Sequence, residues 1–447
     1  MKTMKHLLKL NNIFFLLLFV SANLFAETKW EVAIVFLDDS TDVHENIKEI
    51  QSLPKNASLS VSVFKDQLEN LPSFLDHAYK SSTSKKSLIV YSHGKGPEGL
   101  KDVSTHDLKK IIADHTPPLD ILWFDACFMA NMEFLYELKS LSQFTIASED
   151  AEFAAGMPFQ SLDLLPSTNT AAEAALMLGK NFIESYSYLK AGSQRSYVRE
   201  SSATISIFEN SKWDLLATNL KLISEKMKNL RYNTQMLQKH YSMENKELVD
   251  FGHLLIAIRA ANKDASFDKL LTYTIRLLNI QSIRKLRSNP RVKIANPERN
   301  SLLVFGFNNW SVGSENDFST SDIFTQIVSH DNFILGPKNT NWPYKKETAK
   351  TIMLTPFAPG INIFNYYFLN SDATKLLTDG KSIARTSDIV EIYRENNNSP
   401  LLYSAYTQEI GKQAERYTGL SITMPGTIPS LDYFALEFNQ NINWLSL

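Results

Sequence analysis

The sequence predicts an α/β fold in which helices cover both faces of a mostly parallel central sheet. Two observations in residues 27–150 indicate this fold. Five short segments are apolar along most of their length, which is typical of strands buried on both faces. The intervals between them are long enough for helices, as the crossovers of a parallel sheet require. The rest of the chain is less regular, so we expect a helical and irregular C-terminal half packed on this core.

The five apolar segments are the predicted strands. In chain order they are Trp30–Leu37, Leu59–Phe64, Ser87–Ser92, Leu119–Phe124 and Gln143–Ser148. The helix between the third and fourth strands is the best defined, because Ser104 and Asp107 resemble a capping box and Pro117 ends the helical pattern. Such crossovers are nearly always right-handed, so these two strands should be parallel.

Three regions are expected along the chain. Residues 1–26 have the pattern of a signal peptide, with three lysines, an apolar segment and small residues before Ala26. Residues 27–210 should form the α/β core and residues 211–447 the C-terminal region, with a late strand near 419–425. The apolar segment is shorter than the roughly 20 residues that span a bilayer. We therefore expect a periplasmic or secreted protein without a stable membrane anchor after signal cleavage.

Composition excludes some functions and raises one question. Lysine and arginine number 46 against 48 acidic residues, so no global field favours nucleic acid as a partner. The chain has a single cysteine, Cys127, which cannot form an internal disulfide. This residue is either a small apolar core residue or a reactive thiol.

The position of Cys127 favours the reactive thiol. His93 follows the third predicted strand and Cys127 follows the fourth. The carboxyl ends of parallel strands meet at one edge of the sheet, where open α/β folds place their sites. Neighbouring strands lie about 4.8 Å apart, which brings an imidazole and a thiol within reach of one carbonyl group. The alternative is that His93 is a structural histidine in an ordinary turn.

Two further features would support a nucleophile at this edge. A glycine at Gly94 lets the backbone approach a ligand, so the N–H groups of Gly94 and Cys127 are candidates for an oxyanion hole. A helix beginning directly after Cys127 would place its positive end beside the sulfur, which favours the thiolate.

Asp125 is a charge in an unexpected place. It stands two residues before Cys127 on the same strand, so both side chains point to the same side. An unpaired carboxylate there would raise the pKa of the thiol unless a cation compensates for it. A lysine or arginine of a substrate would be such a cation. The alternative is that Asp125 caps the following helix.

Three segments closely resemble the clostripain-like cysteine peptidases, which belong with caspases, legumains and gingipains. They are YSHGKG, DACFMANMEFLYELKS and IASEDAEFAAGMPF, with weaker similarity in ELVDFGHLL and YTGLSITMP. The resemblance implies a caspase-like three-layer sandwich, with His93 as acid/base and Cys127 as nucleophile. It also implies that Asp125 lies in the S1 pocket and selects a basic P1 residue. The loop acids Glu149, Asp150 and Glu152 are expected to add charge to that pocket.

The function that follows is an exported cysteine endopeptidase that cleaves proteins or peptides after Arg or Lys through a thioester. The resemblance also raises calcium as a cofactor and self-cleavage after a basic loop residue. The loop candidates for self-cleavage are Lys95, Lys101, Lys190, Arg195 and Arg199.

Other classes of function are less well supported. A non-catalytic peptide-binding protein of the same fold is the main alternative, although it would not need both His93 and Cys127. A thiol redox protein would lack a second cysteine as resolving partner. A metal hydrolase would lack a His-x-x-x-His ligand pair, so no metal site is predicted from the sequence.

Overall fold

A computed structural model describes the greater part of the chain. The described ranges are 30–190, 203–228, 245, 247–278, 285–287, 303–307, 352–356, 363–368, 382–385, 388–394, 396–408, 417–425 and 430–444. The expected signal peptide at residues 1–26 lies outside the described residues.

A nine-stranded sheet forms the centre of the fold, with strand order β11-β16-β17-β9-β7-β6-β3-β1-β2. Its strands are β1 Trp30–Phe36, β2 Leu59–Phe64, β3 Lys85–Tyr91, β6 Leu119–Asp125, β7 Ser142–Ala147, β9 Thr204–Glu209, β11 Lys285–Arg287, β16 Asp388–Tyr393 and β17 Leu401–Gln408. The five strands from β2 to β7 pair in parallel. The pairs from β7 to β11 are antiparallel.

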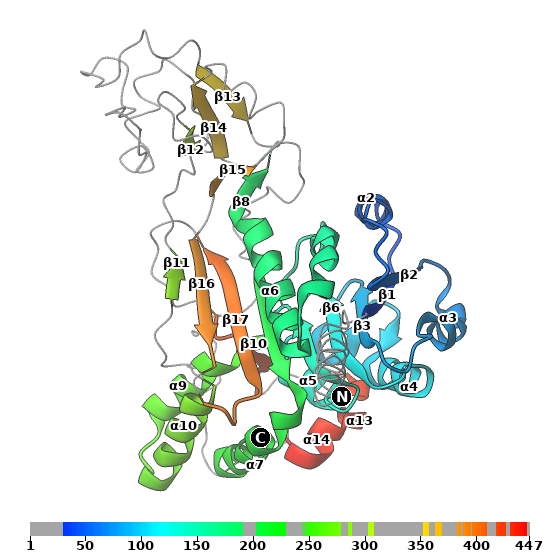
Figure 1. The fold of residues 1–447 in the computed structure, drawn as a ribbon. Coiled ribbons are helices and arrows are strands. Elements are labelled where there is room, and N and C mark those ends of the chain that lie inside the picture. Colours follow the sequence, from blue (N-terminus) through cyan, green and yellow to red (C-terminus); the bar gives the residue numbers. More distant parts are fainter. Residues whose placement is uncertain are drawn as a thin grey trace, which may run out of the picture.

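All five predicted strands are confirmed, with ends within two residues of the prediction. The four antiparallel strands were not predicted as part of this sheet. They join segments far apart in the chain: Tyr403 of β17 lies opposite Ile207 of β9. In Figure 1 these C-terminal strands, drawn in orange, lie beside the green part of the chain. Local sequence patterns cannot reveal a pairing of this range.

The side chains of the sheet divide into two hydrophobic layers, as strand alternation requires. In β1, Trp30 and Ile34 face a cluster that contains residues of α2 (Thr41–Gln51) and α6 (Ala171–Ser187). Ala33 and Val35 face the opposite cluster. That second cluster includes α3 Leu71–Ala78, α4 Thr105–His115, α5 Met132–Leu138 and α7 Trp213–Met227. The predicted α/β sandwich of three layers is therefore confirmed.

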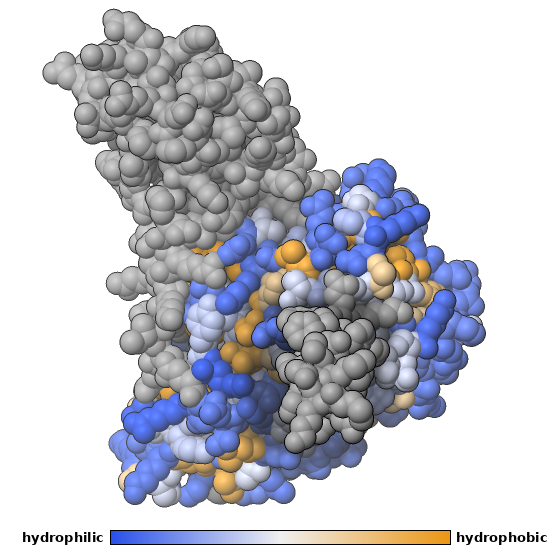
Figure 2. Space-filling view, in the orientation of Figure 1, coloured by the Kyte–Doolittle hydropathy of each residue, from blue (hydrophilic) through white to orange (hydrophobic). Residues whose placement is uncertain are grey.

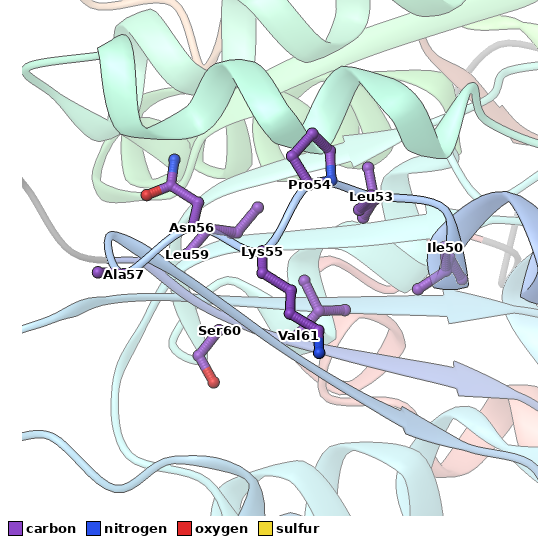
Figure 3. Close-up of a pocket in the computed structure, with 9 residues that line it drawn as sticks. All are labelled: Ile50, Leu53, Pro54, Lys55, Asn56, Ala57, Leu59, Ser60 and Val61. Carbon is purple, nitrogen blue, oxygen red and sulfur yellow. The ribbon is translucent and has the colours of Figure 1, made fainter.

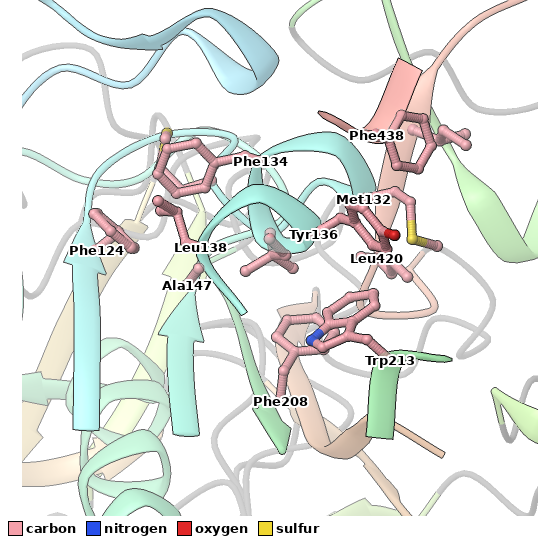
Figure 4. Close-up of a cluster of buried hydrophobic side chains, with 14 of the residues drawn as sticks. Phe124, Met132, Phe134, Tyr136, Leu138, Ala147, Phe208, Trp213, Leu420 and Phe438 are labelled. Carbon is pink, nitrogen blue, oxygen red and sulfur yellow. The ribbon is translucent and has the colours of Figure 1, made fainter. Parts of the chain in front are cut away.

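The second layer holds the helix α5 that follows the candidate nucleophile. Figure 4 shows Phe124 of β6 and Phe134 of α5 beside one another, with ring centroids 4.7 Å apart in an edge-to-face arrangement. Both rings are fully buried. Burying a phenylalanine contributes roughly 1.5–3 kcal/mol, so this contact fixes α5 firmly on the strand that carries the site.

The predicted helix between β3 and β6 is also confirmed. In α4, the Ser104 hydroxyl oxygen accepts a hydrogen bond from the backbone N–H of Asp107 at 3.1 Å. Ser104 in turn donates to the Asp107 carboxylate at 2.8 Å. These reciprocal bonds satisfy the first turn of the helix and set where it begins.

The C-terminal region returns to the core at α5. β10 Leu248–Asp250 pairs with β18 Ser421–Thr423, which is the expected late strand. The remaining helices are α9 Phe251–Ala261, α10 Ala265–Leu277, α13 Leu431–Ala435 and α14 Glu437–Ile442. The remaining strands form the hairpin β4 Gly99–Leu100 with β5 Val103–Ser104, the antiparallel pair β8 Tyr188–Lys190 with β15 Ser382–Arg385, and a sheet of β12 Leu303–Phe307, β13 Ile352–Pro356 and β14 Ile363–Phe368. Buried Glu133 of α5 accepts a hydrogen bond from the N–H of Thr423 at 3.0 Å. Glu137 accepts one from Phe438 at 2.7 Å.

The described surface has separate hydrophobic areas and one shallow depression. Figure 2 shows a mainly hydrophilic described surface on one side, with hydrophobic residues in separate areas. No described helix is both long and apolar enough to cross a bilayer. A depression of about 550 Å³ lies between Ile50 and Val61, beside the start of β2 (Figure 3). Because parallel strands end where β6 delivers Cys127, this depression is at the opposite edge of the sheet from that residue.

Candidate active site

The ends of three neighbouring parallel strands are in register. Tyr91, the last residue of β3, lies opposite Phe36 on β1 and opposite Asp125 on β6. Two residues further along the same three segments stand Asp38, His93 and Cys127. The prediction that His93 and Cys127 follow adjacent parallel strands is confirmed, and Asp38 joins them at the same level of the sheet edge.

Gly94 brings the His93 segment against the Cys127 backbone. A Cβ atom at this position would lie 1.8 Å from the Cys127 carbonyl oxygen, so only glycine fits. Gly94 also forms a bridge with Leu100, whose two hydrogen bonds are donated by the N–H groups of Lys95 and Lys101. The N–H group of Gly94 is therefore not used by the hydrogen bonds of that bridge.

The Cys127 sulfur is half-buried and lies against the backbone of Glu152. The N–H of Glu152 donates to Sγ at 3.2 Å, and the Glu152 carbonyl oxygen lies 3.7 Å from Sγ. A thiol can donate to that carbonyl, whereas a thiolate accepts from the N–H. The same residue thus provides a partner for either protonation state of the sulfur.

The helix predicted after Cys127 is present, but the prediction that it begins directly after Cys127 is wrong. Helix α5 begins at Met132, and its N-cap is Asn131, whose side-chain oxygen accepts from the N–H of Phe134 at 2.9 Å. The Asn131 amide also donates to the Phe128 carbonyl at 2.6 Å. Residues 128–131 therefore form a turn, in which Phe128 has the left-handed φ of 64°. The N–H group observed to donate to Sγ is that of Glu152, which does not belong to α5.

The turn after Cys127 is held from two sides. Its N–H groups at Phe128 and Ala130 donate to the carbonyls of Asp150 and Ser148, at 3.2 and 2.7 Å. From the C-terminal region, the N–H of Ser421 donates to the Ala130 carbonyl at 3.0 Å. A left-handed phenylalanine costs of order 1–3 kcal/mol, and these bonds hold it in place.

His93 extends from the edge of the sheet, with its side chain 67% exposed. Its Nε2 lies 3.6 Å from Oδ2 of Asp38, whose side chain is only 13% exposed. Lys101 approaches the other oxygen, with Nζ 3.7 Å from Oδ1. Asp38 was missed as a site residue in the sequence. Its position two residues beyond a predicted strand, like His93 and Cys127, was the signal that could have found it.

Asp125 is buried, with 2% of its surface exposed. Its Oδ2 accepts a hydrogen bond from the N–H of Met157 at 2.9 Å. A Cβ atom at Gly156 would lie 2.5 Å from the same oxygen, so the left-handed glycine is needed for this close approach. Burial, together with the charge of Asp125, raises the pKa of Tyr91. Asp125 does not cap α5, because that role belongs to Asn131.

The loop after β7 places its acids in two directions. Glu149 is fully buried, accepts from the N–H of Gly419 at 2.7 Å and faces Asp250. Asp150 is also buried and accepts from the hydroxyl of Tyr417. These two predicted pocket residues therefore contact the segment 417–419. The carboxyl group of this loop that interacts with Asp125 belongs to Glu152, and burial with the Asp125 charge raises the pKa of Glu152 well above its usual range.

The described residues do not support a metal centre. No group of three or more His, Cys, Asp or Glu side chains within them is arranged to hold a metal ion. The calcium suggested by the family resemblance thus has no fitting set of these side chains in the described part of the chain, and no step below depends on it.

Comparison with known proteins adds the following. The model of the clostripain family matches residues 31–446. A secreted C11 cysteine protease from Bacteroides thetaiotaomicron with an irreversible peptide inhibitor is 16% identical, covering 56% of this chain and 82% of that chain at a TM-score of 0.43. An inactive zymogen C11 protease from Parabacteroides distasonis is 12% identical, covering 93% and 99% at a TM-score of 0.47. No curated protein matches the chain.

Proposed function

Because the chain belongs to the clostripain family and is a cysteine peptidase, we propose that it cleaves after Arg or Lys, with Cys127 as nucleophile and His93 as acid/base. One observation carries the proposal: His93 and Cys127 stand two residues beyond the paired Tyr91 and Asp125. A histidine and the chain's single thiol thus share one edge of the sheet, above a buried carboxylate.

The reaction proceeds through a thioester. The Cys127 thiolate attacks the P1 carbonyl carbon, and the N–H groups of Gly94 and Cys127 stabilise the oxyanion. His93 protonates the leaving amine as the peptide C–N bond breaks. Water then attacks the thioester, His93 takes its proton, and Cys127 leaves as thiolate. The close approach of Gly94 to Cys127 supports this arrangement, since both N–H groups belong to one compact piece of backbone.

Asp125 is the proposed acid for the basic P1 side chain. Asp125 is buried and stands two residues before Cys127, and a cation of the substrate would compensate for its charge. Since only 2% of Asp125 is exposed, neighbouring atoms have to move before a lysine or arginine can contact it. The segment 151–156 contacts both residues, through the Glu152 N–H at Sγ of Cys127 and the close approach of Gly156 to Oδ2 of Asp125, so our proposal requires this segment to shift when substrate binds.

Peptides that differ only at P1 test the proposal. Matched fluorogenic peptides should differ in kcat/KM, with the peptides that carry Arg or Lys at P1 cleaved far more efficiently than the peptide that carries citrulline. Cys127→Ala and His93→Ala should reduce cleavage of all three by at least about 10³-fold. Equal cleavage of Arg and citrulline peptides would refute the basic specificity, and full activity of Cys127→Ala would refute the nucleophile.

Two further parts of the proposal concern export and self-cleavage. The N-terminal pattern supports export, and N-terminal sequencing of the mature protein would reveal cleavage near Ala26. Lys95 and Lys101 lie in a backbone-bonded bend, whose amides donate to Gly99 and His93. Arg195 and Arg199 lie outside the described residues. Such a bonded bend resists entry into a protease site, and Lys190 is paired with Ser382 between β8 and β15, so these three lysines are disfavoured as sites of self-cleavage.

A further inference from the structure

We propose that Tyr186 and Tyr91 hold residues 151–157 closed over the P1 site, so that breaking their two hydroxyl contacts admits the basic side chain of a substrate. Residues 151–157 are called the strap below. The inference rests on the proposed function, because it takes Asp125 as the acid that binds P1. It goes beyond that function by assigning control of access to two buried phenol groups outside the reacting pair.

The strap contacts both residues of the proposed site. At one end, the N–H of Glu152 donates to Sγ of Cys127 at 3.2 Å. At the other end, the N–H of Met157 donates to Oδ2 of Asp125 at 2.9 Å. A Cβ atom at Gly156 would lie 2.5 Å from that oxygen. A P1 ammonium or guanidinium group therefore needs the space and the acceptor oxygen that the closed strap occupies.

Tyr186 holds the strap from α6. Its hydroxyl donates to the Gly156 carbonyl at 2.6 Å, and its ring stacks on Phe153 with centroids 4.9 Å apart and ring planes at 27°. The helix itself is fixed on the sheet, because the buried ring of Phe182 lies edge-on to Trp123 with centroids 5.9 Å apart. One side chain on a rigid helix therefore contacts the strap both in its middle and near its end.

Tyr91 holds the strap from β3. Its hydroxyl donates to the Ala154 carbonyl at 2.5 Å. Tyr91 is the last residue of β3, and Asp125 lies opposite it on β6. Its ring is buried beside Phe36, with centroids 5.5 Å apart. The two phenols thus bond the strap to a helix and to the sheet, at carbonyl groups two residues apart.

The strap can move as a unit once these contacts break. Residues 151–157 belong to no helix or strand. Within the strap, the N–H of Gly156 donates to the Phe153 carbonyl at 2.9 Å, which forms a turn that does not depend on neighbouring elements. A hydrogen bond of the phenol type shifts an equilibrium by about three- to tenfold. A P1 cation at Asp125 replaces the bond that Met157 gives up, so substrate binding favours the open strap.

Two alkylating reagents separate access to the P1 site from the reactivity of Cys127. An arginyl chloromethylketone has to place its guanidinium group at Asp125 before the sulfur displaces chloride, whereas iodoacetamide has no P1 group. Tyr186→Phe removes the hydroxyl and keeps the ring on Phe153. In the full chain, this variant should raise the ratio of the arginyl to the iodoacetamide rate constant about three- to tenfold. Tyr91→Phe should raise the same ratio.

Tyr79→Phe is the matched control. The Tyr79 hydroxyl also donates to a backbone carbonyl, that of Ser87 at 3.0 Å, but Ser87 lies near the start of β3 and so at the opposite edge of the sheet. Its ratio should stay at the wild-type value. A ratio that is unchanged or lower in Tyr186→Phe and Tyr91→Phe, or that rises equally in Tyr79→Phe, contradicts the inference.

Hydrogen exchange tests the strap without any variant. The Met157 amide loses its acceptor when an arginyl group occupies Asp125, so it should exchange faster in arginyl-labelled wild type than in protein labelled with iodoacetamide. Equal or slower exchange means that the strap does not open. If wild type reacts equally with arginyl and citrullinyl chloromethylketones, the basic P1 site itself is refuted. Selective labelling of wild type without an effect of the two tyrosine variants refutes only the inference about the strap.

Discussion

The carboxylate of Asp38 lies 3.6 Å from Nε2 of His93 and is far less exposed than the imidazole it faces. The two residues stand at the same level because Phe36 and Tyr91, two positions earlier, are paired neighbours on β1 and β3. At this distance the contact is an ion pair rather than a hydrogen bond, so it acts when the imidazole is protonated. In the proposed mechanism, His93 is in that form when it protonates the leaving amine.

Asp38→Asn should lower kcat about three- to tenfold while leaving KM nearly unchanged, because Asp38 positions His93 and does not contact the substrate. The neighbouring Asp39→Asn is the matched control: Asp39 is 81% exposed and pairs with Lys65 instead. Steady-state kinetics of both variants on the Arg peptide would decide. A rise in KM with unchanged kcat would show that Asp38 serves substrate binding rather than His93.

Gly94→Ala should reduce kcat/KM by roughly 10²-fold or more, because its Cβ would lie 1.8 Å from the Cys127 carbonyl oxygen and force the two segments apart. Gly179→Ala is the control, since its Cβ would meet the flexible end of Ile207 at 2.9 Å, far from the site. That variant should lose about 1–3 kcal/mol of stability and keep its kcat/KM. Comparable activity of the two variants in their folded form would contradict the role given to Gly94.

Asn131→Ala should destabilise the protein by about 1–3 kcal/mol, because it removes the cap of α5 and the donor to the Phe128 carbonyl. Asn131→Asp keeps the capping oxygen and loses only the donor. The free energy of unfolding in urea should therefore be highest for wild type, lower for Asn131→Asp and lowest for Asn131→Ala. Identical stability of wild type and Asn131→Ala would mean that the turn does not depend on this side chain.

Glu149 predicts a dependence of stability on pH. Burial and the nearby Asp250 raise the folded-state pKa of Glu149 well above its ordinary value of 4.5. A raised folded-state pKa means that the stabilising contribution is complete below about pH 4.5 and is lost as the pH rises through the raised value. Glu149→Gln, which cannot ionise, should therefore gain stability relative to wild type as the pH rises from about 4.5 toward the raised pKa.

Chemical unfolding of both proteins across that range measures the difference, with Glu69→Gln at an exposed position as control. The control should run parallel to wild type. A Glu149→Gln curve that also runs parallel would show that Glu149 is ionised in the folded protein.

The sequence predicted the parallel half of the sheet well because each strand there is a continuous apolar segment with a helix after it. It did not predict β9, β11, β16 and β17 in the same sheet, since the pairing of β17 with β9 joins residues nearly 200 positions apart. The start of α5 was misplaced for a local reason. Asn131 caps the helix and also bonds the Phe128 carbonyl, and this combination favours a turn that helical periodicity does not reveal.

The site was predictable where strand ends determine it and less so in the loop after β7. His93, Cys127 and Asp125 follow from the strand positions alone. The acids Glu149, Asp150 and Glu152 share one short stretch, and which of them approaches Asp125 depends on partners from Asp250 and residues 417–419. Those partners lie 100 or more residues away, beyond the range of any local pattern.

The hydrogen bond from Ser421 to Ala130 has a consequence for anyone who would reduce this protein to a minimal catalytic fragment. Residues 27–210 contain His93, Asp125 and Cys127, yet they lack the strand β18, whose Ser421 bonds to the turn after Cys127. Such a fragment would contain these side chains but would lack the hydrogen bond from Ser421 to the Ala130 carbonyl. The late strand β18 therefore supports the backbone that holds Cys127, although it lies almost 300 residues further along the chain.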